Sequence, residues 1–379
     1  MMFEKIKFWL VAVIAILILI YILPVQNIFN YVKFEFYPKS SLHIKLSLVN
    51  PNIKLLSSDP SNRLIMKVEV FNADGQPVPN AHVNLTVSEN LGRISPSNLR
   101  TDKDGESIVS YIPPDYEKNG HSPAKRKVRL TARIYKSKVS SSIDVTLVSN
   151  PIVYIPGYQE NTSAFDNMND YLNSKGYTGN ILAYDSSKGV IDGAKNLKNY
   201  LEQLTKKYYS EGFQTSKFII ISHSMGGLIA RYYTASQQYI TENNVAKMIF
   251  ISVPHSGSPW ASLGMKYFND QSIKDLRPES DLLMKDLPGM LNRGLNGTIE
   301  VGNILGQYDE VVSQESANLD DWSIKTELFS VGDNNLTMNN LFNGTLLNAA
   351  NHQAILSNKK VFNRIYQMIS TRLPSPAFK

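Results

Sequence analysis

Hydrophobic and polar residues alternate along residues 40–149. A period of two is typical of antiparallel strands that bury one face and leave the other in water. Turn-forming residues separate the runs, as at Asn72-Ala73-Asp74-Gly75 and Asp102-Lys103-Asp104-Gly105. The alternating hydrophobic positions are Leu64, Met66, Val68, Val70, Val83, Leu85, Val87, Val128, Leu130, Ala132, Ile134, Ile143, Val145 and Leu147. Several short strands with this spacing predict an all-β sandwich over residues 40–149.

The pattern changes after Ser149-Asn150-Pro151. Continuous apolar runs follow at Ile152 to Ile155, Phe218 to Ile221 and Met248 to Val253, as expected for strands of a parallel sheet that is covered on both faces. Between them, hydrophobic residues recur every three or four positions from Ile191 to Tyr208, which predicts an amphipathic helix. Alternating strands and helices predict an α/β domain over residues 150–379, with a mostly parallel sheet and helices on both faces.

An uncharged, almost wholly aliphatic run occupies Phe8 to Leu23, after Lys5 and Lys7. It is close to the lower limit of about 17 residues for a membrane-spanning helix. We expect a membrane anchor in residues 1–25 and a juxtamembrane linker in residues 26–39. A cleaved signal peptide is the alternative, although no Ala-x-Ala site follows the run. The positive-inside rule then predicts a single-pass protein of the cell membrane with its catalytic domain outside, or a secreted one if the segment is cleaved.

The candidate nucleophile is Ser224, within Ser222-His223-Ser224-Met225-Gly226-Gly227. The segment follows a buried strand and precedes a helical stretch, which is the layout of a nucleophile elbow. A strained backbone at the serine brings the positions two before and two after it together, so both must be small. The usual pattern is G-x-S-x-G, and Ser222 replaces its first glycine here. The alternative is an ordinary strand-turn-helix rich in serine and glycine.

Partners for Ser224 occur in the chain order Ser, acid, His, with Asp309 after a predicted strand and His352 near the C-terminus. Glu310 and Asp333 compete with Asp309 for the role of the acid. His223 and His255 compete with His352 for the role of the base, but His223 adjoins the nucleophile and should point away from it, and His255 is better suited to brace a loop. At Pro156-Gly157-Tyr158 a glycine turn can aim a backbone N–H at the same point as the N–H of Met225.

Residues 150–370 resemble a bacterial lipase or esterase of the α/β-hydrolase superfamily. Val253-Pro254-His255-Ser256-Gly257-Ser258-Pro259 is similar to a T-P-H-x-G-S segment of such lipases, and Asp275 to Leu283 is similar to their cap region. The resemblance implies that Ser224 is the nucleophile, His352 the base and Asp309 the acid. It also implies that the amides of Tyr158 and Met225 form the oxyanion hole. Many such lipases have His-Gly at the oxyanion turn, where this chain has Pro156-Gly157.

A leucine-rich insertion occupies residues 258–297 of this domain. Its apolar residues are Leu276, Leu282, Leu283, Leu287, Met290, Leu291 and Leu295. They predict either a cap or lid over an acyl pocket or a helix that packs into the core.

The segments Val70 to Ala81 and Thr101 to Glu106 resemble the bacterial Ig-like modules of adhesins and extracellular enzymes. A spacer that holds the enzyme off the membrane is one interpretation, and adhesion to cell-wall polymer or substrate is the other. The histidines of this region, His43, His82 and His121, fall in separate stretches, so we predict no metal site there.

Composition narrows the functions further. The 379 residues include 39 Lys and Arg against 33 Asp and Glu, a net charge of +6, without the basic and aromatic clusters of a nucleic-acid groove. The chain has no cysteine, which excludes disulfides, thiolate nucleophiles and cysteine zinc sites. Together with the Ser224 motif and its partners, the resemblance to lipases and esterases implies an extracellular serine hydrolase for ester or lipid substrates, without a metal or organic cofactor. The alternatives are an acyltransferase with the same triad, an amidase or peptidase, and a surface adhesin with an inactive hydrolase domain.

Overall fold

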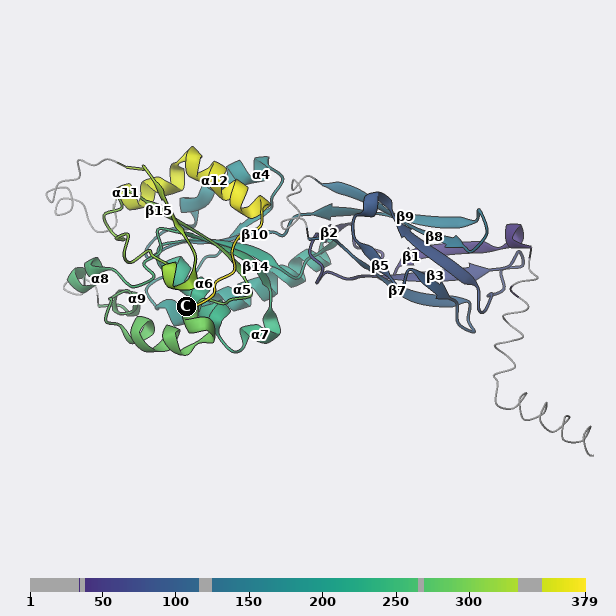
Figure 1. The fold of residues 1–379 in the computed structure, drawn as a ribbon, viewed down its shortest axis with the longest axis horizontal. Coiled ribbons are helices and arrows are strands. Elements are labelled where there is room, and N and C mark those ends of the chain that lie inside the picture. Colours follow the sequence, from purple (N-terminus) through teal and green to yellow (C-terminus); the bar gives the residue numbers. More distant parts are fainter. Residues whose placement is uncertain (1–33, 35–37, 116–124, 265–268, 333–349) are drawn as a thin grey trace, which may run out of the picture. The chain divides into compact units, whose positions relative to one another are not determined.

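The computed structural model describes residues 34, 38–115, 125–264, 269–332 and 350–379 (Figure 1). They form two compact units. Unit 1 takes the described residues within the ranges 1–52, 63–113 and 127–145, and unit 2 takes those within 53–62, 114–126 and 146–379. The predicted anchor in residues 1–25 lies outside the described residues. Among the residues that are described, no helix combines the length and hydrophobicity needed to cross a bilayer.

Unit 1 is built from antiparallel strands. One sheet has the order β1 (His43–Leu48), β3 (Leu64–Phe71), β7 (Glu106–Ile112), β5 (Arg93–Ser95). A second set of paired strands, which belongs to unit 1 except for Arg126 and residues 146–148, has the order β9 (Ser140–Val148), β8 (Arg126–Ile134), β4 (His82–Val87), β6 (Asn98–Arg100). On β3, Leu64, Met66, Val68 and Val70 are buried, as the period of two predicts.

Unit 2 contains a six-stranded sheet in the order β11 (Gly179–Ile181), β10 (Ile152–Ile155), β13 (Phe218–His223), β14 (Val245–Ile251), β15 (Glu300–Gly306), β16 (Thr326–Phe329). Every pairing in it is parallel. Within the same unit, the short strand β2 (Leu55–Ser57) pairs in parallel with β12 (Phe213–Gln214) and with residues 146–148.

Helices cover both faces of this sheet (Figure 1). One face packs against α4 (Asp166–Ser174) and α12 (Lys359–Ser370), and the other against α5 (Val190–Ser210) and α6 (Met225–Ala235). Successive residues of β13 alternate between these two cores, Ile219 and Ile221 on one side and Phe218 and Ile220 on the other. This explains why the strand reads as a continuous apolar run. The remaining helical segments of unit 2 are η3 (Thr162–Phe165), α7 (Tyr239–Glu242), α8 (Pro259–Gly264), α9 (Gln271–Asp275), η4 (Leu282–Asp286), η5 (Leu287–Gly289), η6 (Leu291–Gly294), η7 (Asp320–Trp322), α11 (Ala350–Ala354) and η9 (Ile355–Ser357).

The strand order locates the expected site. From β10 the chain moves to one side to form β11, and then returns to the other side of β10 to form β13 and the strands after it. In open parallel sheets, ligands bind at such a reversal, beyond the carboxyl ends of the strands. The segments that follow β10 and β13 are the Pro156-Gly157-Tyr158 turn and the Ser224 turn.

A buried lysine fixes the end of the C-terminal helix. Lys247 on β14 is 2% exposed, and its ammonium group donates to the carbonyls of Met368 at 3.2 Å, Ile369 at 3.3 Å and Thr371. It also lies 3.5 Å from the carboxylate of Glu300, which accepts the Leu373 amide. The lysine thus satisfies carbonyls that the end of α12 leaves without helical partners.

We expect Lys247→Met to lower the free energy of unfolding of unit 2 by about 3–5 kcal/mol, because the substitution leaves the Glu300 carboxylate buried without its cation. Urea unfolding followed by tryptophan fluorescence measures this, since Trp260 and Trp322 both belong to unit 2. The matched control is Lys206→Met on the exposed side of α5, with an expected change within about 0.5 kcal/mol. Equal effects of the two substitutions would contradict the assigned role of Lys247.

Candidate active site

Ser224 occupies a strained turn between β13 and α6. Its φ of 51° and ψ of −129° are unusual for a residue with a side chain. The Ser224 amide donates to the Ile251 carbonyl at 3.0 Å, and the Ser224 carbonyl accepts the Gly227 amide at 3.0 Å. Strain of this kind persists only where neighbouring structure enforces it, and it is concentrated at functional sites.

Steric contacts explain why the residues around Ser224 are small. A Cβ atom built on Gly226 would lie 2.3 Å from the Ile155 carbonyl oxygen, and one on Gly227 would lie 2.2 Å from a Val253 methyl carbon. Ser222 is fully buried, and its hydroxyl lies 3.5 Å from the Ile249 carbonyl oxygen on the neighbouring strand. The serine that replaces the usual first glycine is therefore accommodated by the adjacent strand.

The Pro156-Gly157-Tyr158 segment, here termed the oxyanion turn, lies directly against Ser224. A Cβ atom built on Gly157 would be 2.8 Å from the Ser224 Cβ. Glu160 Oε2 accepts the Gly157 amide at 2.6 Å, and Ser186 Oγ accepts the Gln159 amide at 2.9 Å. Side chains thus fix the amides on both sides of Tyr158. Met225, the other predicted donor, is the first residue of α6, where the backbone amides have no carbonyl partner within the helix.

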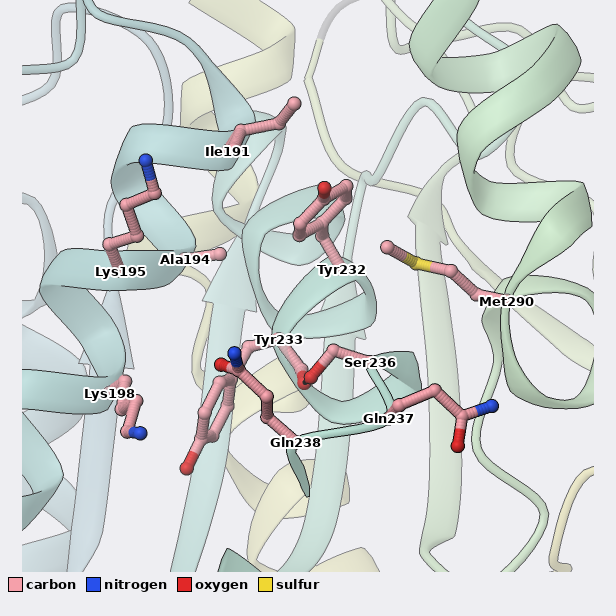
Figure 2. Close-up of a pocket in the computed structure, with 10 residues that line it drawn as sticks. All are labelled: Ile191, Ala194, Lys195, Lys198, Tyr232, Tyr233, Ser236, Gln237, Gln238 and Met290. Atoms are coloured by element: carbon pink, nitrogen blue, oxygen red, sulfur yellow. Dashed lines mark hydrogen bonds between the residues drawn. The ribbon is translucent and has the colours of Figure 1, made fainter. Parts of the chain in front are cut away.

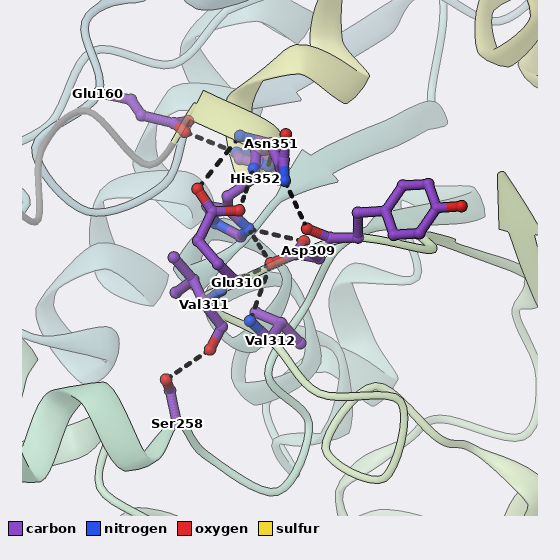
Figure 3. A network of polar contacts seen from close by, with 10 residues as sticks. Glu160, Ser258, Asp309, Glu310, Val311, Val312, Asn351 and His352 are labelled. Atoms are coloured by element: carbon purple, nitrogen blue, oxygen red, sulfur yellow. Dashed lines mark hydrogen bonds and ion pairs between the residues drawn. The ribbon is translucent and has the colours of Figure 1, made fainter. Parts of the chain in front are cut away.

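His352 on α11 contacts Asp309, which lies in the turn after β15. The distances from His352 Nδ1 are 2.9 Å to Asp309 Oδ2 and 3.1 Å to Oδ1 (Figure 3). Asp309 Oδ1 also accepts the amides of Val311 and Val312 at 3.0 and 2.9 Å. Burial alone would raise the pKa of Asp309, but the charge and hydrogen bond of His352 outweigh it and lower the pKa below 3.8. The aspartate is therefore a buried carboxylate that is held in one orientation.

The same surroundings make His352 a stronger base. Burial would lower the pKa of His352, but the carboxylates of Asp309, then Glu160 and Glu310, raise it above its ordinary value of 6.5. Glu310 does not contact the imidazole in the way that Asp309 does. Its two carboxylate oxygens instead accept the amides of Asn351 and His352, each at 3.1 Å (Figure 3). The acidic rival to Asp309 thus holds the backbone that carries His352.

His352 is also adjacent to the Ser224 turn. Its ring centroid is 4.5 Å from that of His223, the residue that precedes Ser224, and His223 Nε2 lies 3.1 Å from the His352 carbonyl oxygen. The fold thus brings Ser224, Asp309 and His352 to the carboxyl edge of one sheet, although Ser224 and His352 are more than a hundred residues apart in the sequence. Asp333, a further candidate for the acid, lies outside the described residues.

The other two candidate bases have partners of their own. His223 Nδ1 lies 2.6 Å from Glu160 Oε1. His255 is buried against Arg231, whose Nη1 lies 3.3 Å from His255 Nδ1 and 3.2 Å from its carbonyl oxygen. Burial lowers the pKa of Arg231 to about 10, and burial with the nearby guanidinium lowers the pKa of His255 well below 6.5. Since Arg231 Nε also donates to the Gly294 carbonyl at 3.0 Å, this pair braces the loops around α6.

The insertion at residues 258–297 is fastened to the domain core. Leu276, Leu282, Leu287 and Leu295 are buried in the same cluster as α5 and α6. Asp275 Oδ2 accepts the Val190 amide at 2.8 Å, and Asp270 Oδ2 accepts the Tyr158 hydroxyl at 2.5 Å. For these leucines the core-packing alternative describes the structure, and α9 is tied to both α5 and the oxyanion turn.

A cavity of about 380 Å³ opens beside α5, the end of α6 and Met290 (Figure 2). Its lining residues are Ile191, Ala194, Lys195, Lys198, Tyr232, Tyr233, Ser236, Gln237, Gln238 and Met290. Ser224, Asp309 and His352 do not line it, so this cavity is separate from the candidate active site. In the parts of the chain with a defined placement, no group of three or more His, Cys, Asp and Glu side chains is arranged to hold a metal ion.

The Glu160–His223 pair is the part of the site that the sequence analysis did not identify. The adjacency of His223 to Ser224 predicts only that its ring points away from the nucleophile, and nothing in the sequence links His223 to Glu160. The available signal was an acidic residue three positions after the glycine of the oxyanion turn.

Comparison with known proteins agrees with this architecture. Residues 149–356, more than half of the 379-residue chain, match the profile of the PGAP1-like alpha/beta domain. The parallel sheet, the strained serine turn and this match together identify the α/β-hydrolase fold predicted from the sequence. No curated protein matches the chain.

Several solved structures share a weaker likeness. The propeptide form of the Bacillus licheniformis lipase BlEst2 has 15% identity and a TM-score of 0.44, with 61% of this chain and 52% of that one covered. The lin2722 product of Listeria innocua has 17% identity and a TM-score of 0.40, with 58% of this chain and 93% of that one covered. The D0-D1 domain of intimin has 20% identity and a TM-score of 0.24, with 30% of this chain and 52% of that one covered. The chain spans about half the length of the intimin fragment and of the lipase pro-form, and at these TM-scores none of the three likenesses bears on function.

Proposed function

We propose that this chain, which belongs to the PGAP1-like alpha/beta domain family, is a serine hydrolase that cleaves carboxylic esters through an acyl-enzyme intermediate. The observation that carries the proposal is the buried Asp309–His352 pair beside the strained Ser224 turn. A serine hydroxyl is a weak nucleophile until an oriented base removes its proton.

In the proposed reaction, His352 Nε2 takes the proton of the Ser224 hydroxyl as Ser224 Oγ attacks the ester carbonyl. Asp309 keeps the imidazole in the tautomer with a proton on Nδ1 and stabilises the imidazolium that forms. The amides of Tyr158 and Met225 would stabilise the oxyanion, each contributing about 2.7–4 kcal/mol. The alcohol leaves with the proton from His352, and a water molecule activated by the same base then releases the acid and restores Ser224.

The substrate that we propose is an ester or lipid with an apolar acyl group. This part of the proposal rests on the resemblance of residues 150–370 to bacterial lipases and esterases, and the contact of Asp270 with the Tyr158 hydroxyl places the start of α9 beside the oxyanion turn. An apolar surround also strengthens the hydrogen bonds to the oxyanion, since it lowers the local dielectric constant.

Placement and accessory roles are further proposals. We propose an anchor or cleavable signal in residues 1–25, with the catalytic domain outside the cell. For the antiparallel strands of unit 1, we propose an Ig-like module that acts as a spacer or binds cell-wall polymer. An acyltransferase and an adhesin with an inactive hydrolase domain are the competing functions.

A p-nitrophenyl ester series from short to long acyl chains tests the proposal on the purified full chain. We expect hydrolysis with an optimum in acyl length, which would distinguish an esterase from a lipase. An added acceptor alcohol should leave the release of free acid dominant, whereas a majority of transesterified product would favour acyl transfer. Folded protein that neither turns over any ester nor reacts with a fluorophosphonate probe would favour the adhesin.

A further inference from the structure

A second buried pair, Glu160 and His223, lies between the oxyanion turn and His352, and no step of the proposed reaction uses it. The two side chains are 4% and 0% exposed, and Glu160 Oε1 lies 2.6 Å from His223 Nδ1. In Figure 3, Glu160 comes from the side of the site opposite to Asp309. His352 is therefore flanked by two carboxylate–histidine contacts, its own with Asp309 and the neighbouring one of His223 with Glu160.

Each member of the pair also holds one half of the catalytic apparatus. Glu160 Oε2 accepts the Gly157 amide at 2.6 Å, which fixes the oxyanion turn. His223 Nε2 lies 3.1 Å from the His352 carbonyl oxygen. Because a carbonyl oxygen can only accept a hydrogen bond, Nε2 is the donor. A continuous path of hydrogen bonds thus runs from Gly157 through Glu160 and His223 to the backbone of His352.

Stability alone does not account well for such a pair. Two charged or polar groups lose their hydration when they are buried, and apolar residues of similar volume often stabilise a protein as well or better. Burial raises the pKa of Glu160, but His223, the Gly157 amide and His352 outweigh it and lower the pKa below 4.5, so the group is a carboxylate near neutral pH. A satisfied buried network does, however, fix geometry, which catalysis requires.

On these contacts, and resting on the proposed function, we propose that Glu160 and His223 are positioning residues. They fix the positions of the oxyanion turn and of the His352 backbone relative to each other and to Ser224. The Tyr158 amide and the His352 imidazole must act on the same tetrahedral intermediate from two sides, and they belong to segments that are almost two hundred residues apart in the sequence. The Glu160–His223 link couples these segments without contact with the substrate.

The test compares Glu160→Ala, which removes the link, with Glu160→Gln, which can keep it. A glutamine oxygen can accept the Gly157 amide while its NH₂ group donates to Nδ1 of a neutral His223, whose Nε2 still donates to His352. Kinetics of p-nitrophenyl ester hydrolysis by the full chain are measured per active site, with sites counted by fluorophosphonate titration, so that any unfolded fraction does not enter kcat. The control is Glu211→Ala, at an exposed position after α5.

We expect Glu160→Ala to lower kcat per site about 10²-fold, with KM within about twofold of the wild type, because misplacement by about 1 Å costs this much. Glu160→Gln should retain kcat within about fivefold, and Glu211→Ala should match the wild type. A wild-type kcat per site in Glu160→Ala, even if that protein is less stable, would overturn the proposal, as would an equal loss in Glu160→Gln. Absence of turnover and labelling in the wild type would instead refute the proposed function itself, so the two failures are distinguishable.

Discussion

Ser224→Ala is expected to lower kcat for ester hydrolysis by about 10⁶-fold, and His352→Ala by a similar factor. The alanine at position 224 leaves no atom to form the acyl-enzyme. Loss of His352 leaves the Ser224 hydroxyl without a base. It also removes the imidazole that Asp309 contacts at 2.9 Å. Since the three residues would act as a unit, the double variant should be no slower than either single one.

Initial rates with the preferred p-nitrophenyl ester measure these losses, and circular dichroism verifies that each variant is folded. Ser210→Ala at the end of α5 and His43→Ala on β1 are matched controls at exposed positions, expected to retain wild-type rates. Retention of more than about a hundredth of the activity by folded Ser224→Ala would point to another nucleophile.

Asp309→Asn is expected to lower kcat by about 10⁴-fold with little effect on folding. The asparagine oxygen can still accept the Val311 and Val312 amides, but its NH₂ group facing Nδ1 favours the wrong tautomer of His352. The wild-type base acts only when neutral, and its pKa is raised above 6.5. The wild-type kcat/KM should therefore fall as the pH drops through a value above 6.5.

The carboxylate that raises the pKa of His352 most is lost in Asp309→Asn, whereas the burial that lowers it remains. The residual activity of this variant should therefore have its acid limb at a lower pH than the wild type. A kcat/KM profile between pH 5 and 9 gives both the size and the direction of the change. Asp166→Asn on the exposed start of α4 is the control. An unchanged acid limb, or a loss of less than about tenfold, would favour Glu310 or Asp333 as the acid.

The elements of unit 2 that were predictable from the sequence are those in which the residue pattern fits only one kind of structure, or the position accepts only one type of residue. Four apolar residues in succession fit a strand with two covered faces, and only glycine fits position 226, where a Cβ atom would meet the Ile155 carbonyl. The sequence favours Asp309 over Glu310 only through the resemblance of Asp309 and Val311-Val312 to the acid loop of such lipases. The structure shows how the two carboxylates differ, because Asp309 contacts an imidazole and Glu310 accepts backbone amides.

Pairings between distant segments were not predictable in this way. Glu160 and His223 are 63 residues apart, and neither has a local pattern that selects the other. Strand β2 has three residues, too few for a recognisable period, and its place in unit 2 depends on pairing with β12. The leucines of residues 258–297 fit a lid and a core helix equally well by sequence, because both require an apolar face, and only their burial against α5 and α6 separates the two.

The most direct test of the proposed function is intact-mass spectrometry of the full chain after reaction with a fluorophosphonate, followed by peptide mapping. A serine becomes reactive to this probe only when a base and an oxyanion hole act on it together. We predict a single adduct on the peptide that contains Ser224, and none on the Ser224→Ala protein. Folded protein without an adduct, or with its adduct on another residue, would contradict the assignment of Ser224 as the nucleophile.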